Sequence, residues 1–354
     1  MNQTALDLDA LPTDHGDPSE RTGFELGWDH AQHGLVPPAQ TLQGDTPVSQ
    51  GWLAGKAVFG RRTLQATRFV RLAQQLRTQA WQKGILFDHQ QVTPQYLAQL
   101  QTPVCPVTRM VLGGLPGTAS APVVERLHAA AGFIAGNLVV VSQAAAGARA
   151  GCTASQAAAH ARSIEAGKAA DVSGLDAPAW WRLACLLSFV TPLSHLDAAR
   201  MPLRALPPSG IRAVNPAQRL QAMLTVQLAS PGWSGRLRRL AATLPDAGLR
   251  HDFNLFIGAL APRLLEAPVD ADAMCLRHAL EDAWADARVN RRWQHFIVQL
   301  GQTESEALLQ RTPTPLPPRR SRAGSRVDLA SMSSQRVLAS TFFTLQSQKI
   351  QQLP

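Results

Sequence analysis

Residues 123–151 read VVERLHAAAGFIAGNLVVVSQAAAGARAG, and this stretch decides the fold. Two runs rich in β-branched residues, VVERL and LVVVS, flank a loop that contains Gly132 and Gly136, and an alanine-rich run follows. Glycine adopts backbone angles that are closed to other residues, so the pattern predicts a strand, an ordered loop, a second strand and a helix. Asn137 stands where the loop meets the second strand, and its amide can bind the loop backbone there.

Apolar residues recur at helical spacing on both sides of this stretch. The sequence therefore predicts a mainly α fold with a small β-hairpin (ββα-like) insert. Both ends of the chain are too polar to bury a core, so we expect disordered tails there. We divide the chain into a tail (1–20), an N-terminal helical part (21–103), the hairpin segment (104–151), a C-terminal helical part (152–310) and an Arg/Pro-rich tail (311–354) that can end in a short helix.

The composition predicts a water-soluble protein with a real core, because 45% of the 354 residues are hydrophobic. No run of about 18 apolar residues exists, so we expect no membrane span and no membrane partner. The acidic N-terminus lacks the basic and then apolar pattern of an export signal. The four cysteines lie far apart and form no CxxC pair, which is typical of reduced thiols in the cytoplasm.

The net charge of +9 favours an anionic partner such as a nucleic acid. The run RVNRRWQ contributes Arg288, Arg291 and Arg292 as candidate phosphate contacts, with Trp293 available to stack on a base. The alternative is a solvated helix face, neutralised by the acids of EDAWADA just upstream. The Arg/Pro-rich tail has the same two interpretations: an arm that contacts phosphate or a protein partner, or a solvated linker.

The hairpin segment resembles the HNH endonuclease family, whose ββα unit binds one divalent metal ion. Glu125-Arg126-Leu127 stands where many members have an Asp-Arg pair, Gly132-Phe133 stands for Gly-Tyr, and Gly136-Asn137 ends the loop. LVVVS matches the second strand, and Cys105-Pro106-Val107-Thr108 is similar to the start of the first strand of such proteins. The resemblance is confined to residues 104–151.

The resemblance implies a metal site with Glu125 and Asn137 as ligands of Mg²⁺ or Mn²⁺ and His128 as the base that activates water. Ala146 stands where the family has a ligand on the helix, and alanine cannot bind metal. We therefore expect a degenerate, inactive site and no cofactor. Arg126 and Arg149 can still contact phosphate without any chemistry.

Three functions follow from these observations. The leading hypothesis is a nucleic-acid-binding protein with a degenerate HNH-like site. The alternative is a helical structural or interaction protein in which the hairpin is only architecture. The third is an active metal-dependent nuclease with an unorthodox ligand set. Steeply salt-dependent DNA binding separates the first from the second, and metal-dependent cleavage marks the third.

Overall fold

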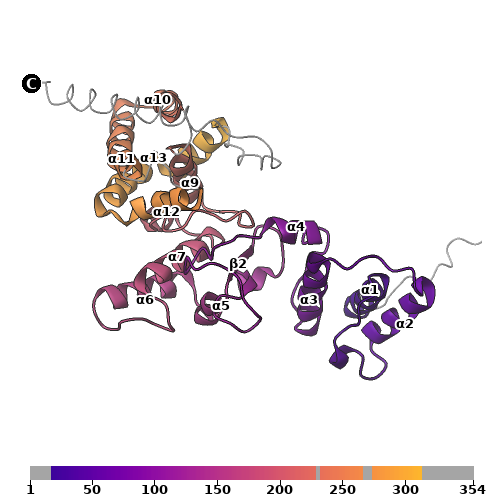
Figure 1. The fold of residues 1–354 in the computed structure, drawn as a ribbon. Helices are drawn as coiled ribbons and strands as arrows, with labels where there is room; N and C mark the ends of the chain where they lie inside the picture. Colours follow the sequence, from indigo (N-terminus) through magenta and orange to yellow (C-terminus); the bar gives the residue numbers. More distant parts are fainter. Residues whose placement is uncertain (1–16, 229–231, 266–272, 313–354) are drawn as a thin grey trace, which may run out of the picture. The chain divides into compact units, whose positions relative to one another are not determined.

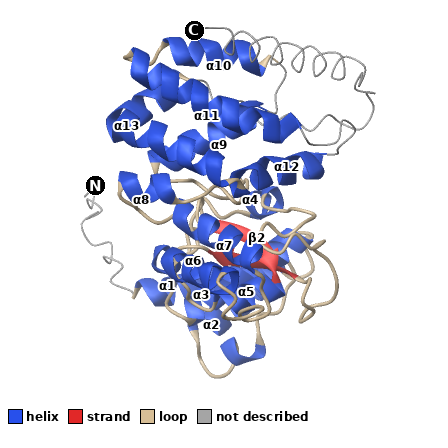
Figure 2. Cartoon of the chain, turned by 90° about the vertical axis from the view of Figure 1, so that its left-hand side faces the viewer, coloured by secondary structure: helices blue, strands red, loops and turns tan. Residues whose placement is uncertain are grey.

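A computed structural model describes residues 17–228, 232–265 and 273–312. It is mainly helical and contains one two-stranded antiparallel hairpin within these residues, which confirms the predicted fold class (Figures 1 and 2). Most of the two predicted tails lies outside the described residues. The edges of the tails do not match the prediction, because the first helix already begins at Pro18 and the last one continues to Arg311.

The described residues form two compact units. The first contains the residues up to Gln101 together with the short stretch Ala130–Ala135. The second contains Thr102–Ala129 and the residues from Gly136 onward. The hairpin strands therefore belong to the same unit as the C-terminal helices.

The first unit is built on a close pair of helices, α1 (Pro18–Gln32) and α2 (Pro47–Phe59). A Cβ atom added to Gly27 would lie 2.0 Å from the carbonyl oxygen of Val48, and one added to Gly51 would lie 2.0 Å from that of Phe24. The two backbones are therefore in direct contact, which only glycine permits. The unit is completed by η2 (Ala39–Thr41), α3 (Arg68–Gln82) and α4 (Pro94–Gln99).

The second unit begins with the hairpin of β1 (Pro122–Arg126) and β2 (Leu138–Ser142), in which Pro122 pairs with Ser142 and Arg126 with Leu138. The turn η3 (Ala129–Ala131) lies between the strands, and α5 (Gln143–Arg149) follows β2 directly. The remaining elements are α6 (Ala154–Glu165), α7 (Ala177–Phe189), α8 (His195–Arg200), α9 (Pro216–Leu228), α10 (Trp233–Ala242), α11 (Ala247–Leu265), α12 (Ala273–Asp282), η4 (Ala283–Ala285) and α13 (Ala287–Arg311).

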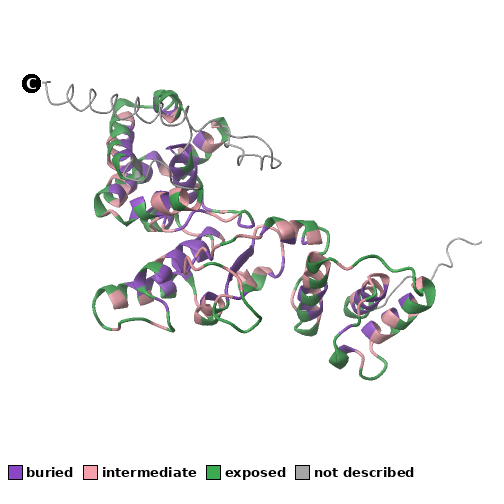
Figure 3. Cartoon of the chain, viewed as in Figure 1, coloured by how far each residue is buried: buried purple, intermediate pink, exposed green. Residues whose placement is uncertain are grey.

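The core of the second unit includes aromatic rings from α11, η4 and α13. Trp293 packs against Phe256, Trp284 and Phe296, with ring centroids 5.2–6.1 Å apart, and it is completely buried. Figure 3 shows the buried residues along the inner sides of these helices. The expectation that Trp293 stacks on nucleic-acid bases is therefore wrong, because its ring is part of the core.

No helix in the described ranges is both long enough and apolar enough to cross a bilayer. No disulfide joins the four cysteines in the described structure, and Cys105 and Cys185 are buried. Burial raises the pKa of the Cys185 thiol to about 12, so it stays protonated at neutral pH.

Candidate functional site

The candidate site is the small motif formed by β1, β2, α5 and the loop between the strands. Gly132 and Gly136 both adopt positive φ angles, as the sequence pattern predicted. Ser142 ends β2 and caps α5, because its side chain accepts a hydrogen bond from the backbone N–H of Ala145. The strand, loop, strand and helix therefore follow one another in the predicted order.

Asn137 closes the loop through its side-chain amide. The Oδ1 atom accepts a hydrogen bond from the backbone N–H of His128 at 2.8 Å, and the Nδ2 atom donates to the carbonyl oxygen of His128 at 2.9 Å. Asn137 is buried, so both bonds are shielded from water. The loop-binding role that the sequence predicted for this amide is confirmed, and the amide that a metal would need is already engaged.

Glu125 is paired with the arginine that ends α5. Arg149 Nη1 donates to Glu125 Oε2 at 2.9 Å, and Arg149 Nη2 donates to the carbonyl oxygen of Leu127 at 2.7 Å. The Arg149 side chain is only 11% exposed. Burial lowers the pKa of Arg149, and the neighbouring Glu125 carboxylate partly offsets this effect. This arginine therefore holds α5 on β1 and is not available to contact phosphate.

Two further candidate residues lie beside this pair. Arg126 is half-buried, and its Nη1 atom donates to the carbonyl oxygen of Ala129 at 2.9 Å. The His128 ring is also half-buried and makes no hydrogen bond within the described part of the chain. The structure thus brings Glu125, Arg126, His128, Asn137 and Arg149 into one small motif, but uses most of their polar groups internally.

The residues present do not fit a divalent metal ion. Glu125 is the only acidic residue between positions 104 and 151, and its carboxylate is bound by a guanidinium group. Ala146 packs against the core and offers no ligand atom. No group of three His, Cys, Asp or Glu side chains suited to a metal exists within the described ranges. A metal at Glu125 would have to displace Arg149 and would find too few oxygen or nitrogen donors.

The start of the hairpin segment contains a turn whose contacts the sequence did not reveal. Cys105 Sγ accepts hydrogen bonds from the backbone N–H groups of Thr108 at 3.5 Å and Ser142 at 3.3 Å. Burial raises the pKa of the Cys105 thiol, but the hydrogen bonds from Ser142 and Thr108 outweigh burial and leave the pKa below its usual value. The turn places Arg109 in the left-handed region at φ 59°, where it reaches α12.

Arg109 binds Asp282 in a bidentate ion pair, with N–O distances of 2.7 and 2.8 Å, and its Nη2 atom lies 3.2 Å from Glu281. Glu281 also accepts a hydrogen bond from Arg277 Nε at 3.0 Å. A bidentate guanidinium–carboxylate pair is among the stronger side-chain contacts. These ion pairs join the hairpin segment to the C-terminal helices.

A basic ridge, formed by Arg288, Arg291 and Arg292, lies on the first turns of α13. These positions are spaced i, i+3 and i+4, so the three side chains share one face of the helix. Arg288 and Arg291 are exposed, and Arg292 is half-buried. Within the described residues, none of the three side chains has a hydrogen bond or an ion pair.

The upstream acids that were expected to neutralise the basic ridge have other partners. Glu281 and Asp282 pair with Arg109, and Asp286 pairs with Arg263 at 2.6 Å. Asp286 also caps α13 by accepting from the backbone N–H of Arg288. The positive charge of the basic ridge is therefore not cancelled by the adjacent EDAWADA run.

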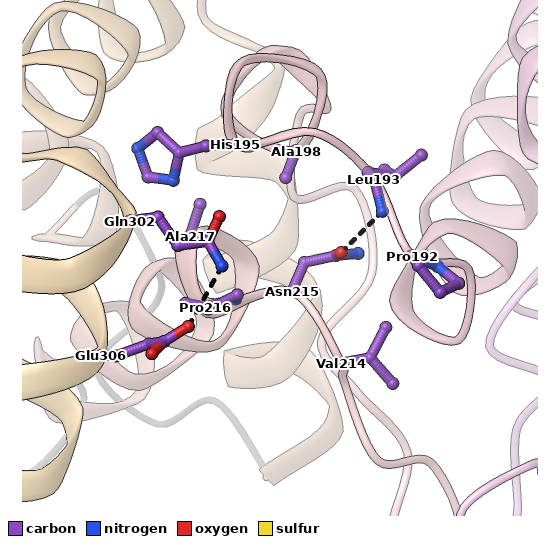
Figure 4. A pocket seen from close by; sticks show the side chains of 10 residues that line it. All are labelled: Pro192, Leu193, His195, Ala198, Val214, Asn215, Pro216, Ala217, Gln302 and Glu306. Atoms are coloured by element: carbon purple, nitrogen blue, oxygen red, sulfur yellow. Dashed lines mark hydrogen bonds between the residues drawn. The ribbon is translucent and has the colours of Figure 1, made fainter.

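A separate small pocket of about 190 Å³ lies among α8, α9 and α13 (Figure 4). His195, Gln302 and Glu306 line one side of it. His195 Nε2 lies 2.8 Å from the carbonyl oxygen of Ile297, while its buried Nδ1 atom has no hydrogen-bond partner in the described structure. The pocket contains none of the sequence-predicted site residues, and one buried ring nitrogen without a partner in the described structure does not define a ligand.

Comparison of the chain with known protein families, curated proteins and solved structures gives no match. The likeness of residues 104–151 to HNH endonucleases therefore remains a resemblance of short motifs.

Proposed function

We propose that this protein binds the phosphate backbone of a nucleic acid and does not cut the nucleic acid. The observation that carries the proposal is the basic ridge on α13, whose three arginines have no acidic partner within the described residues. An unpaired cluster of arginines on one helix face attracts polyanions and releases their counterions on binding. The four cysteines, which form no disulfide in the described structure, support a cytoplasmic location.

The ion pair between Glu125 and Arg149 supports the non-cutting part of the proposal. Hydrolysis by a ββα unit needs a metal ion to stabilise the developing charge and a base to activate water. Here a guanidinium group from α5 pairs with Glu125, the only carboxylate in residues 104–151, where a metal ion would have to bind. The motif then acts as a structural element, and no cofactor is required.

The test is binding of the purified protein to labelled duplex and single-stranded DNA over a salt series, with and without Mg²⁺ or Mn²⁺. The same samples are run on a denaturing gel. We expect binding that weakens steeply with salt and strands that remain intact. Cut strands, with cutting lost in Glu125→Ala or His128→Ala, would instead establish the active nuclease.

One observation favours a second candidate function, a helical interaction scaffold. Arg149 and Trp293, two of the expected nucleic-acid contacts, serve the fold itself. Absence of DNA binding at low salt would support this scaffold. The Arg/Pro-rich tail from residue 313 onward lies outside the described residues, so a protein partner for it stays a prediction.

A further inference from the structure

The first unit contains a long segment without acidic residues. Positions 46–87 include seven Lys and Arg residues and no Asp or Glu. Only Arg77 among the seven has an acidic partner in the described structure, and it pairs with Glu25 and Asp29 on α1. The charge of the remaining six is not cancelled by contacts within the segment.

Five of these six residues follow one another from the end of α2 to the start of α3. We call Lys56, Arg61, Arg62, Arg68 and Arg71 the α2–α3 basic surface, and all five are exposed. Among the described residues, their side-chain hydrogen bonds and ring interactions are with neutral groups: Lys56 lies over the Trp52 ring at 4.5 Å, and Arg68 lies over the Phe69 ring and donates to Gln101 at 3.4 Å. Figure 3 shows the connecting segment exposed along nearly its whole length.

The path of the segment is fixed by backbone hydrogen bonds. The N–H of Arg62 donates to the carbonyl oxygen of Phe59, and that of Leu64 donates to Gln32, both at 2.8 Å. Thr67 caps α3 by accepting from the N–H of Val70 at 3.3 Å. Residues 62–67 form no helix or strand, so Arg62 and Arg68 can lie up to about 20 Å apart. This upper limit equals the axial length of about six successive phosphates of one nucleic-acid strand, so the segment can follow up to that many.

We propose that the α2–α3 basic surface is a second nucleic-acid-binding surface, which follows the phosphate backbone without reading sequence. The charges are mostly arginine, and the exposed Thr63 and Gln65 between them can donate hydrogen bonds to phosphate oxygens. A membrane-binding surface would need a continuous apolar face, but Val58 and Leu64 are the only large apolar residues exposed between Lys56 and Arg71, and Arg61 and Arg62 stand between them in the sequence. The proposal rests on the proposed function, because both surfaces would act on the same polyanion.

The test compares three forms of the full-length protein on a labelled random-sequence duplex over a salt series. The first is the wild type, the second is Arg61→Gln/Arg62→Gln/Arg68→Gln/Arg71→Gln, and the third carries Lys at the same four positions. We expect the Gln variant to bind at least tenfold more weakly at low salt. Its plot of log affinity against log salt should be shallower by roughly 0.9 for each lost phosphate contact. The Lys variant should recover most of the affinity, and thermal unfolding should be alike in all three.

The possible results separate this proposal from the proposed function. If the wild type binds DNA and the Gln variant binds equally well with the same salt slope, the proposal that the α2–α3 basic surface binds nucleic acid is wrong, and the proposed function stands. If the wild type does not bind duplex at low salt, both are wrong. Binding to vesicles rich in phosphatidylserine that is lost in the Gln variant, without DNA binding, would identify an anionic membrane as the partner instead.

Discussion

Arg149, the last residue of α5, lies 2.9 Å from the carboxylate of Glu125 on β1, and this contact joins the helix to the strand. A second hydrogen bond from Arg149 to the carbonyl oxygen of Leu127 fixes the guanidinium group at the end of the strand. Both contacts tie α5 to β1 through protein groups alone. It follows that Arg149 should matter for stability more than for nucleic-acid binding.

We expect Arg149→Met to lower the free energy of unfolding by about 1–3 kcal/mol, since it leaves a shielded carboxylate and a carbonyl oxygen without partners. Glu125→Gln should cost less, because the amide oxygen still accepts from Arg149. Urea unfolding followed by circular dichroism measures both. An unchanged unfolding free energy in Arg149→Met would show that the ion pair does not hold the motif together.

Asn137 and His128 offer a matched pair of variants in the same loop. Asn137→Ala removes the two hydrogen bonds to the His128 backbone, so we expect a loss of about 1–3 kcal/mol. His128→Ala leaves those backbone groups in place and should change stability by less than about 0.5 kcal/mol. Chemical unfolding of the two variants gives the comparison, and equal losses would contradict the role assigned to Asn137.

The order of elements in the ββα unit could be predicted from the sequence, because glycines and β-branched runs act over short distances. The bidentate pair of Arg109 and Asp282 could not, since these residues are separated by 173 positions and only the tertiary fold brings them together. The burial of Trp293, by contrast, could have been predicted from the sequence. Val289, Trp293, Phe296 and Leu300 recur at helical spacing and mark the buried face of α13, which lies beside the basic ridge on the helix.

The space around two helical glycines predicts opposite effects of an alanine substitution on stability. Gly27→Ala would push a methyl group into the backbone of α2, and we expect it to destabilise the first unit by about 1–3 kcal/mol. Gly147 lies in α5 with nothing within 4 Å of an added Cβ, so Gly147→Ala should stabilise by up to about 1 kcal/mol. Thermal unfolding measures both, and a tolerated Gly27→Ala would refute the close backbone packing.

The first unit should also lose stability in mild acid. Burial of His30 lowers its pKa below the usual 6.5, and its Nδ1 atom lies 2.8 Å from the carbonyl oxygen of Leu26. Below pH 6.5 the unfolded chain takes up a proton that the folded chain does not, so the stability present above this pH is lost as the pH falls. His30→Gln should flatten this dependence. Urea midpoints measured between about pH 5 and 7.5 test this, and parallel curves for wild type and His30→Gln would disprove it.

The central claim is that the basic ridge on α13 binds phosphate. It is tested most directly by the salt dependence of duplex DNA affinity for the wild type and for Arg288→Gln/Arg291→Gln/Arg292→Gln. The account predicts weaker binding by the variant and a salt slope that is shallower by about 0.9 for each arginine that contacts phosphate, so by up to about 2.7. An affinity and a slope identical to those of the wild type would contradict it.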